Sequence, residues 1–222
     1  VFMTGWDSSL EGGDGGYVEL GFVRSTDEGT SFSAEVPRNI PTATEGVDRP
    51  SIIVDSTGVT HLTYQQGTKS YYRRSTDNGV TFSSPLELGA PVASGSSAMH
   101  TPLMAIDPGN ANNVWIVFTD GGDDIIYSTR SANGGKNFSY PNNFSSGTDG
   151  FAAVLVVDLY GIPHVITNMG DSNIQYFTSS NGGLSLNSSS PIASTDDTDS
   201  LDMKVAPSGI VHVVYGDPSY AW

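Results

Sequence analysis

Residues 71–82 read Tyr-Tyr-Arg-Arg-Ser-Thr-Asp-Asn-Gly-Val-Thr-Phe and contain the turn that decides the fold of this chain. The side chain of Asp77 can accept hydrogen bonds from backbone N–H groups that follow it, which closes a tight turn. Gly79 can take a positive φ that a Cβ would penalise. Ser75 can bond locally in the same way, and Phe82 can bury itself between neighbouring sheets. The stretch therefore predicts a hairpin with a structural role.

The same pattern of Ser, Asp or Asn, Gly and a large apolar residue occurs four times in the chain. Its third positions are spaced 50, 56 and 48 residues apart, and recurrence in this range is typical of propellers and related arrays. The third and fourth copies carry Asn in place of Asp, and the fourth ends on Leu186. We expect a structural role for the positions Ser25, Asp27, Gly29, Phe32, Ser75, Asp77, Gly79, Phe82, Ser131, Asn133, Gly135, Phe138, Ser179, Asn181 and Gly183.

This repeated turn resembles the Asp-box, also called the bacterial neuraminidase repeat. The resemblance covers nearly the whole chain as a fold, but only the four turns as a motif. It implies an all-β fold, an Asp-box β-propeller of four-stranded antiparallel blades, of the sialidase-like superfamily. In that family the boxes lie on the face away from the active site. We use the name box below for residues 25–32, 75–82, 131–138 and 179–186, numbered first to fourth.

Around each box the sequence predicts one four-stranded unit. Apolar runs predict inner strands and second strands, fourth strands are expected to begin near Thr81 and Asn137, and almost no helix is expected. We predict a single propeller domain over residues 1–222 with about four to five blades: a partial first blade (1–41), blades at 42–90, 91–144 and 145–194, and a partial last blade (195–222). Because a propeller must close to remove its edges, we expect either an excerpt from a ring of five to eight blades or a ring completed by another chain.

Composition excludes some classes of partner. The formal charge of −15 in 222 residues argues against nucleic acid, because phosphate binding needs clustered Lys and Arg, and against anionic membrane surfaces. No apolar run reaches the ~18 residues that would predict membrane insertion. The chain has no cysteine, which removes disulfides and thiolate metal sites. Enrichment in Ser, Thr, Asn and Gly favours an extracellular or cell-surface location.

The repeat also explains several conspicuous residues. His61, His164 and His212 share the pattern Gly-x-x-His at the start of successive second strands. Residues repeated on different blades lie too far apart to chelate one ion, so packing or hydrogen bonding is the expected role. Arg24 and Arg74, like Arg130, stand directly before a box, and we expect them to be structural or exposed.

The sialidase resemblance implies three arginines that clamp a substrate carboxylate, a Tyr nucleophile with a Glu partner, and an Asp acid/base. In that family the first arginine begins an Arg-Ile-Pro motif on an inner strand. Here Asp48-Arg49-Pro50 places the arginine one residue closer to the proline, and a one-residue shift on a strand turns a side chain to the other face. No arginine follows at the matching positions, and residues 65–69 contain no carboxylate. The machinery is therefore expected to be absent or incomplete.

Loops at the mouth opposite the boxes are the expected ligand site, since loops carry function on a rigid scaffold. A Trp beside carboxylates can stack on a sugar face while the acids bond its hydroxyls. Acidic Gly-rich loops can also hold calcium through oxygen ligands, but none here has the spacing of an EF-hand. Solvated surface loops are the alternative interpretation. The candidate ligand-binding residues are Trp6, Asp7, Asp48, Arg49, Gln65, Asp120, Asp217 and Tyr220.

Three hypotheses for function follow from the sequence. The first is an extracellular or cell-surface module that binds a glycan or a protein partner without complete catalytic machinery. The second is a sialidase-like glycoside hydrolase whose catalytic residues lie partly outside this chain. The third is a structural repeat module of an extracellular assembly. Fold cannot choose among them, because propellers host many unrelated functions.

Overall fold

The structure is a computed structural model that describes residues 20–33, 47–67, 69–89, 102–119, 125–144, 153–169, 173–189, 191–194 and 200–216. These residues form β-strands joined by turns. Within this described part of the chain, no helix is long and apolar enough to span a membrane.

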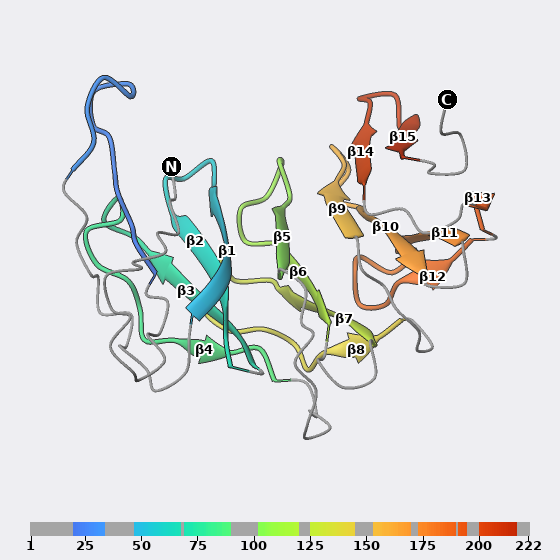
Figure 1. Cartoon of the computed structure of the whole chain (residues 1–222), viewed down its shortest axis with the longest axis horizontal. Helices are drawn as coiled ribbons and strands as arrows, with labels where there is room; N and C mark the ends of the chain where they lie inside the picture. The colour runs from blue at the N-terminus through green and yellow to red at the C-terminus, as the bar shows by residue number, and fades with distance from the viewer. Residues whose placement is uncertain are drawn as a thin grey trace, which may run out of the picture.

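The strands form four antiparallel sheets in chain order, arranged like the spokes of a fan (Figure 1). The first sheet contains β1 (Val47–Val54), β2 (Thr60–Gln66), β3 (Lys69–Ser75) and β4 (Leu86–Glu87); the second contains β5 (Leu103–Ile106), β6 (Val114–Thr119), β7 (Ile126–Ser131) and β8 (Asn142–Asn143). The third contains β9 (Ala153–Val157), β10 (Pro163–Met169), β11 (Asn173–Thr178) and β12 (Asn187–Ser188), and β13 (Ala193–Ser194) also pairs with β11. The last described sheet contains β14 (Leu201–Val205) and β15 (Val211–Tyr215).

The predicted propeller architecture is confirmed. The inner strands β1, β5, β9 and β14 contact one another in sequence along the inside of the arc (Figure 1). Apolar clusters fill the spaces between neighbouring sheets; one, for example, joins Tyr72 of β3 to Ile116 and Phe118 of β6. Burying these faces between spokes is what holds the sheets together, because apolar surface leaves water there.

The predicted starts of the fourth strands were wrong. These strands begin at Leu86 and Asn142 rather than near Thr81 and Asn137. The reason is local: the backbone N–H of Thr81 donates to Asp77 Oδ1 at 2.9 Å, and that of Asn137 donates to Asn133 Oδ1 at 3.2 Å. The backbone N–H groups of Thr81 and Asn137 are therefore engaged within the box and do not pair with the third strand.

Each box forms the predicted hydrogen-bonded turn. In the second box the Ser75 hydroxyl donates to Asp77 Oδ1 at 2.6 Å and accepts from the backbone N–H of Gly79 at 2.8 Å. The Thr81 hydroxyl donates to Asp77 Oδ2 at 2.6 Å. These bonds hold the pKa of Asp77 well below its usual range. In the first box the hydroxyls of Ser31 and Ser25 lower the pKa of Asp27 to about 2 in the same way, so both carboxylates stay ionised.

The two boxes with Asn keep the turn because the side chain four residues after the Asn accepts a hydrogen bond instead of donating one. The Oδ1 atoms of Asn133 and Asn181 accept the same backbone N–H bonds that Asp accepts. Their Nδ2 atoms then donate, to Asn137 Oδ1 at 2.6 Å and to Ser185 Oγ at 2.9 Å. The partner four residues after the Asn therefore acts as an acceptor, whereas in the Asp boxes it is a donor.

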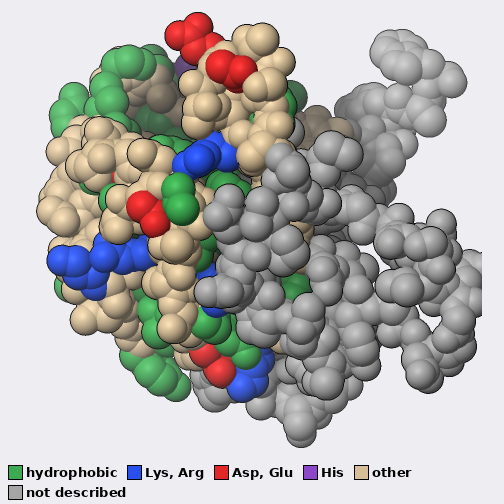
Figure 2. Space-filling model, turned by 90° about the vertical axis from the view of Figure 1, so that its left-hand side faces the viewer, with side chains coloured by type: hydrophobic (Ala, Val, Ile, Leu, Met, Phe, Trp, Pro, Cys, Tyr) green, Lys and Arg blue, Asp and Glu red, His purple; other side chains and the backbone are tan. Residues whose placement is uncertain are grey.

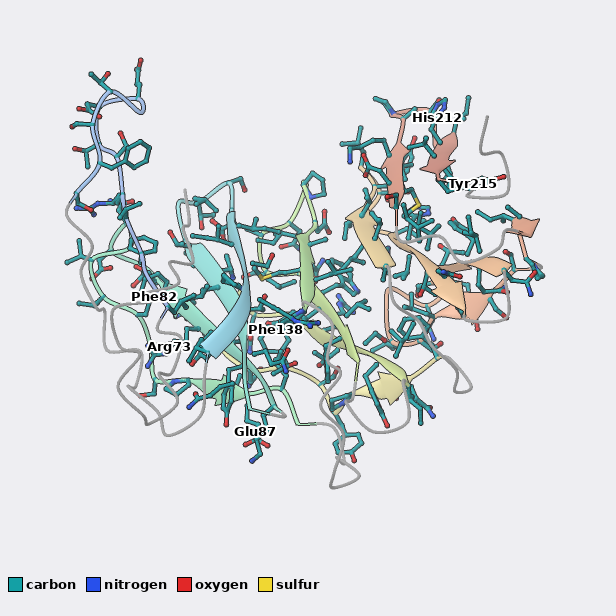
Figure 3. All side chains as sticks on the ribbon, viewed as in Figure 1. Arg73, Phe82, Glu87, Phe138, His212 and Tyr215 are labelled. Atoms are coloured by element: carbon teal, nitrogen blue, oxygen red, sulfur yellow. The ribbon has the colours of Figure 1, made fainter. Side chains whose placement is uncertain are left out.

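Each of the last three boxes also presses its glycine against an aromatic ring of the preceding unit. A Cβ at Gly79 would lie 2.6 Å from Cζ of Phe22, and one at Gly135 would overlap the Tyr72 hydroxyl. In the second and third boxes the apolar residue, Phe82 or Phe138 (labelled in Figure 3), packs edge to face beside the same ring, with 5.3 Å between the ring centres of Phe82 and Phe22 and 4.8 Å between those of Phe138 and Tyr72. The glycine is thus required both for its positive φ and for close approach.

The arginines before the boxes reach across the same boundary. Arg24 Nη1 donates to the carbonyl of Asn78 at 2.7 Å, and Arg74 Nη1 donates to the carbonyl of Gly134 at 3.1 Å. Asn78 and Gly134 occupy the same position in the second and third boxes. The structural role expected for these two arginines is therefore a hydrogen bond to the next box.

We expect the substitution Gly135→Ala to lower the free energy of unfolding by about 3 kcal/mol, because it adds overlap with Tyr72 to backbone strain. Gly209→Ala is the matched control: its φ of +84° is as unfavourable, but no described atom lies within 4 Å of its Cβ position, so a loss of about 1 kcal/mol is expected. Urea denaturation of the two variants measures both values. Equal losses would contradict the close-approach argument.

Candidate functional site

The mouth opposite the boxes is where β1 begins and β2 ends, since the boxes lie at the other end of each sheet. Of the eight predicted ligand-binding residues, the described part of the chain includes Asp48, Arg49 and Gln65. The structure brings these three together, because Asp48 pairs with Gln65 across β1 and β2. Trp6, Asp7, Asp120, Asp217 and Tyr220 lie outside the described residues.

Arg49 stands at an irregularity of the inner strand. The register of β1 against β2 shifts between Asp48 and Ser51, and Arg49 has a φ of +53°. A side chain in this left-handed region costs about 1–2 kcal/mol relative to ordinary backbone. The other two non-glycine residues with positive φ, among those described, are Glu28 and Asn78, which both lie in box turns. Arg49 is therefore the one such residue at the mouth within the described chain.

Tyr64 and Gln65 are adjacent near the end of β2, and each has a buried side-chain oxygen without a hydrogen-bond partner among the described residues. Gln65 donates from Nε2 to the carbonyl of Gly67 at 2.9 Å, but its buried Oε1 has no hydrogen-bond partner among the described residues. The same holds for the hydroxyl of Tyr64, whose ring is fully buried and stacks on Tyr71 at 5.6 Å. Burial raises the pKa of Tyr64. Buried polar atoms of this kind are uncommon and call for an explanation.

Arg73 is a residue that sequence reasoning missed. Its side chain is only 3 % exposed, and a buried arginine is rare. Burial lowers its pKa, while the nearby Tyr64 favours its charged form. Strand alternation was the available signal: Tyr71, Arg73 and Ser75 share the face of β3 opposite to Tyr72 and Arg74. The face of Arg73 is therefore distinct from the face that bonds to the next box.

The hollows lined by described residues include one at each end of the sheets. One of about 510 Å³ lies at the mouth end of the last sheet, lined by Ser200, Leu201, Asp202, Val214, Tyr215 and Gly216. The other, about 420 Å³, lies on the box side, where β1, β5 and β9 end; Asp55, Asp107 and Lys204 are its charged lining residues. The carboxylates of the second hollow are used by turns, since Asp55 and Asp107 accept from the backbone N–H groups of Thr57 and Gly109. The described residues include no cluster of three or more His, Cys, Asp or Glu that could hold a metal ion.

A buried chain of three polar residues, Asp55, His61 and Tyr72, resembles a catalytic arrangement but is structural. His61 Nε2 lies 3.2 Å from Asp55 Oδ2, and Nδ1 lies 2.7 Å from the Tyr72 hydroxyl. Burial lowers the pKa of His61 although Asp55 opposes it, so the neutral ring donates to Asp55 and accepts from Tyr72. Both ring residues are at most 1 % exposed, which leaves no access for a substrate.

The expected role of the repeated histidines is confirmed for two of three. His164 repeats the hydrogen bond to a tyrosine, with Nδ1 2.6 Å from the Tyr176 hydroxyl, and its Nε2 lies 3.4 Å from Asp158 Oδ2 without a hydrogen bond among the described residues. His212 is exposed on β15, and Ala206 stands where the others have Asp. The second sheet places Trp115 at the matching position of β6, with the Arg130 guanidinium 5.3 Å from its ring centre. Because Ser128 replaces the tyrosine there, it is Trp115 that meets the next box glycine, Gly183.

Comparison with solved structures identifies the architecture. A Hadza microbial sialidase matches 85 % of the chain with a TM-score of 0.56 and 16 % identity. An intramolecular trans-sialidase from Ruminococcus gnavus matches 90 % with a TM-score of 0.59 and 14 % identity. A polysaccharide lyase, an ulvan lyase, matches 86 % with a TM-score of 0.56 and 13 % identity. The fold is that of the sialidase propellers.

The sialidase-type propeller here is partial relative to these structures, because the chain spans 49 % of the microbial sialidase, 46 % of the trans-sialidase and 54 % of the lyase. No protein-family model matches the chain, and no curated protein matches it either. At these identities the likeness shows the fold alone, and one fold here carries more than one chemistry.

We expect acid to destabilise this sialidase-type propeller through His61. Because the folded state holds this ring neutral, its contribution is present above the ordinary pKa of ~6.5 and is lost as the pH falls below it, by at most about 1.4 kcal/mol per pH unit. Urea denaturation at pH 7 and 5.5 measures the loss. His61→Gln should be less stable at pH 7 but should lose less on acidification, whereas the exposed His212→Gln should behave like the parent; the reverse ranking would contradict this role.

Proposed function

We propose that this chain is a binding module whose mouth, opposite the boxes, binds an anionic group of a glycan through Arg49. The supporting observation is the φ of +53° at Arg49. A glycine there would remove strain of about 1–2 kcal/mol, so the backbone conformation at this position does not favour an arginine. Strained residues of this kind cluster at ligand-binding sites, where the surrounding structure holds them in place.

The chemistry of the neighbouring residues supports a carbohydrate ligand. A guanidinium matches a carboxylate with two parallel hydrogen bonds. Gln65 of β2 is half-buried and pairs with Asp48, the neighbour of Arg49, and a side-chain amide can hydrogen-bond to sugar hydroxyls. The similar solved structures include sialidases and a polysaccharide lyase, whose names denote carbohydrate substrates. A glycan that carries a carboxylate therefore fits the chemistry of these side chains.

Binding without hydrolysis is the form of the proposal that the residues support. The positions that match Asp48-Arg49-Pro50 on later inner strands hold Thr101, Ala152 and Ser200, so no second or third arginine stands at these positions. The loop after Tyr64 carries Lys69 but no carboxylate to act as an acid or base. We accordingly assign to the chain a binding role at the surface of, or outside, the cell.

The substitution Arg49→Gly separates stability from binding. We expect it to raise the free energy of unfolding by about 1 kcal/mol, because glycine tolerates positive φ, and to abolish binding on an array of acidic and neutral glycans. Asn78→Gly is the matched control, since Asn78 has a φ of +59° in the second box; it should gain similar stability and keep its glycan signal.

Two results would contradict the proposal. One is an array on which the parent chain binds no glycan; the other is an Arg49→Gly variant that binds as the parent does. Release of free sugar from any glycan that binds would show catalysis and would replace the binding role by the hydrolase hypothesis.

A further inference from the structure

The boxes contain the three Asn-Gly dipeptides of the chain, at residues 78–79, 133–134 and 181–182. An Asn-Gly dipeptide is prone to deamidation, because glycine has no Cβ to hinder the approach of its backbone nitrogen to the side-chain Cγ of the Asn. The reaction needs a backbone N–H that can lose its proton and a side-chain carbonyl that can carry negative charge. The structure gives the three dipeptides different environments in both respects.

The backbone N–H of the glycine is free in only one of the three dipeptides. The N–H of Gly79 donates to Ser75 Oγ at 2.8 Å, and that of Gly134 donates to the carbonyl of Asn112 at 3.0 Å. A hydrogen bond of this kind favours the protonated form of the nitrogen and so opposes its conversion to a nucleophile. The N–H of Gly182 donates to none of the described residues, and Gly182 is exposed.

The length of a neighbouring turn explains the difference between Gly134 and Gly182, which occupy the same position in their boxes. Asn112 lies in the turn of residues 107–113, which joins β5 to β6 of the second sheet. The corresponding turn of the third sheet spans only residues 158–162. This shorter turn brings no carbonyl to the N–H of Gly182.

The carboxamide of Asn181 is polarised by its own box. Its Oδ1 accepts from the hydroxyl of Ser179 at 2.9 Å and from the backbone N–H of Ser185 at 3.0 Å. Two donors on one carbonyl oxygen stabilise the negative charge that develops there when a nucleophile adds to the carbon, as in an oxyanion hole. Asn133 Oδ1 accepts the equivalent bonds in the third box. The third and fourth boxes therefore share this activation and differ in the freedom of the glycine nitrogen.

A cation also lies beside the free nitrogen. Arg130 Nη1 is 3.8 Å from the position that a Cβ of Gly182 would occupy, and Arg130 Nη2 is fixed by a 2.7 Å hydrogen bond to Asn113 Oδ1. A nearby positive charge favours the deprotonated form of a group. The guanidinium therefore assists the loss of the proton from Gly182.

We propose that Asn181 is a site of spontaneous deamidation and that the fourth box accepts the resulting aspartate. The Gly182 nitrogen loses its proton to solvent and bonds to Cγ of Asn181. The bond from Cγ to Nδ2 then breaks, and Nδ2 takes up a proton from solvent and leaves as ammonia. Water opens the five-membered imide: cleavage of the new bond gives aspartate, and cleavage at the backbone carbonyl gives isoaspartate. One water is consumed, one ammonia is released, and nothing is oxidised or reduced.

The first box shows how the aspartate fits. It has Asp27 at the position of Asn181 and Ser31 at the position of Ser185, and the Ser31 hydroxyl donates to Asp27 Oδ2 at 2.6 Å. The Ser185 hydroxyl now accepts from Asn181 Nδ2 at 2.9 Å and can rotate to donate to a carboxylate. The acidic side chains of the first box are exposed on the segment that protrudes at the top of Figure 2. Asn181 is exposed as well, so the new charge stays in water.

Peptide mapping by mass spectrometry, on the folded chain kept in mildly alkaline buffer, measures the conversion at each dipeptide. Asn133 and Asn181 are both followed by two glycines, so they are matched in local sequence. We expect Asn181 to convert about tenfold or more faster than Asn133 in the folded chain. In concentrated urea, where the boxes are lost, the two should convert at the same rate.

The variant Asn181→Asp tests whether the box accepts the product. It should unfold at the same urea concentration as the parent at neutral pH, because Ser185 can supply the donor that Ser31 supplies in the first box. Asn181→Ala is the control: it removes the acceptor of the Ser185 N–H and should unfold at a lower urea concentration.

Equal conversion of Asn133 and Asn181 in the folded chain would overturn the assignment of the site. So would a folded chain in which Asn181 stays intact while urea allows its conversion. An Asn181→Asp variant as unstable as Asn181→Ala would overturn the claim that the box accepts aspartate. None of these measurements involves a glycan or Arg49, so this proposal and the proposed function fail separately.

Discussion

The close approach of a box backbone to an aromatic ring of the preceding unit is the constraint on which the rest of this structure depends. At Gly135 the backbone lies so near the Tyr72 hydroxyl that any side chain would overlap it. The turn that permits this approach is held from within, by a serine hydroxyl and by an Asp or Asn side chain. Local hydrogen bonds thus shape a hairpin, and the hairpin sets the spacing between two sheets whose residues are distant in sequence.

This arrangement separates structural chemistry from functional chemistry. Asp55, His61 and Tyr72 would suggest catalysis, but they have a structural role. His61 bonds to Asp55 and to the hydroxyl of Tyr72, and the Tyr72 ring is the one that the third box contacts. The opposite ends of the strands carry no box, and the strained Arg49 and the unused acceptor of Gln65 occur there. A scaffold secured at one end can tolerate strain at the other, because the apolar clusters between the sheets hold both ends in register.

The second sheet shows that the contact, rather than any particular residue, is what the fold maintains. There Ser128 replaces the tyrosine of β3 and β11, and Trp115 of the neighbouring strand supplies the ring instead. Arg130 lies beside that ring and bonds to Asn113 at 2.7 Å, rather than to the next box as Arg74 does. The aromatic ring that contacts the next box can thus come from the third strand of a sheet, as Tyr72 does, or from the second strand, as Trp115 does.

The sequence alone determined the architecture, the position of each box and the hydrogen-bonding role of His61 and His164, because these depend on short patterns repeated at a steady period. It did not predict the late start of β4 and β8, since the reach of the box hydrogen bonds to Thr81 and Asn137 appears only in three dimensions. Only the tertiary structure decided that Arg49 adopts a positive φ and that Trp115 substitutes for a tyrosine. Each of these results arises from packing or pairing between segments remote in the chain, which no local pattern encodes.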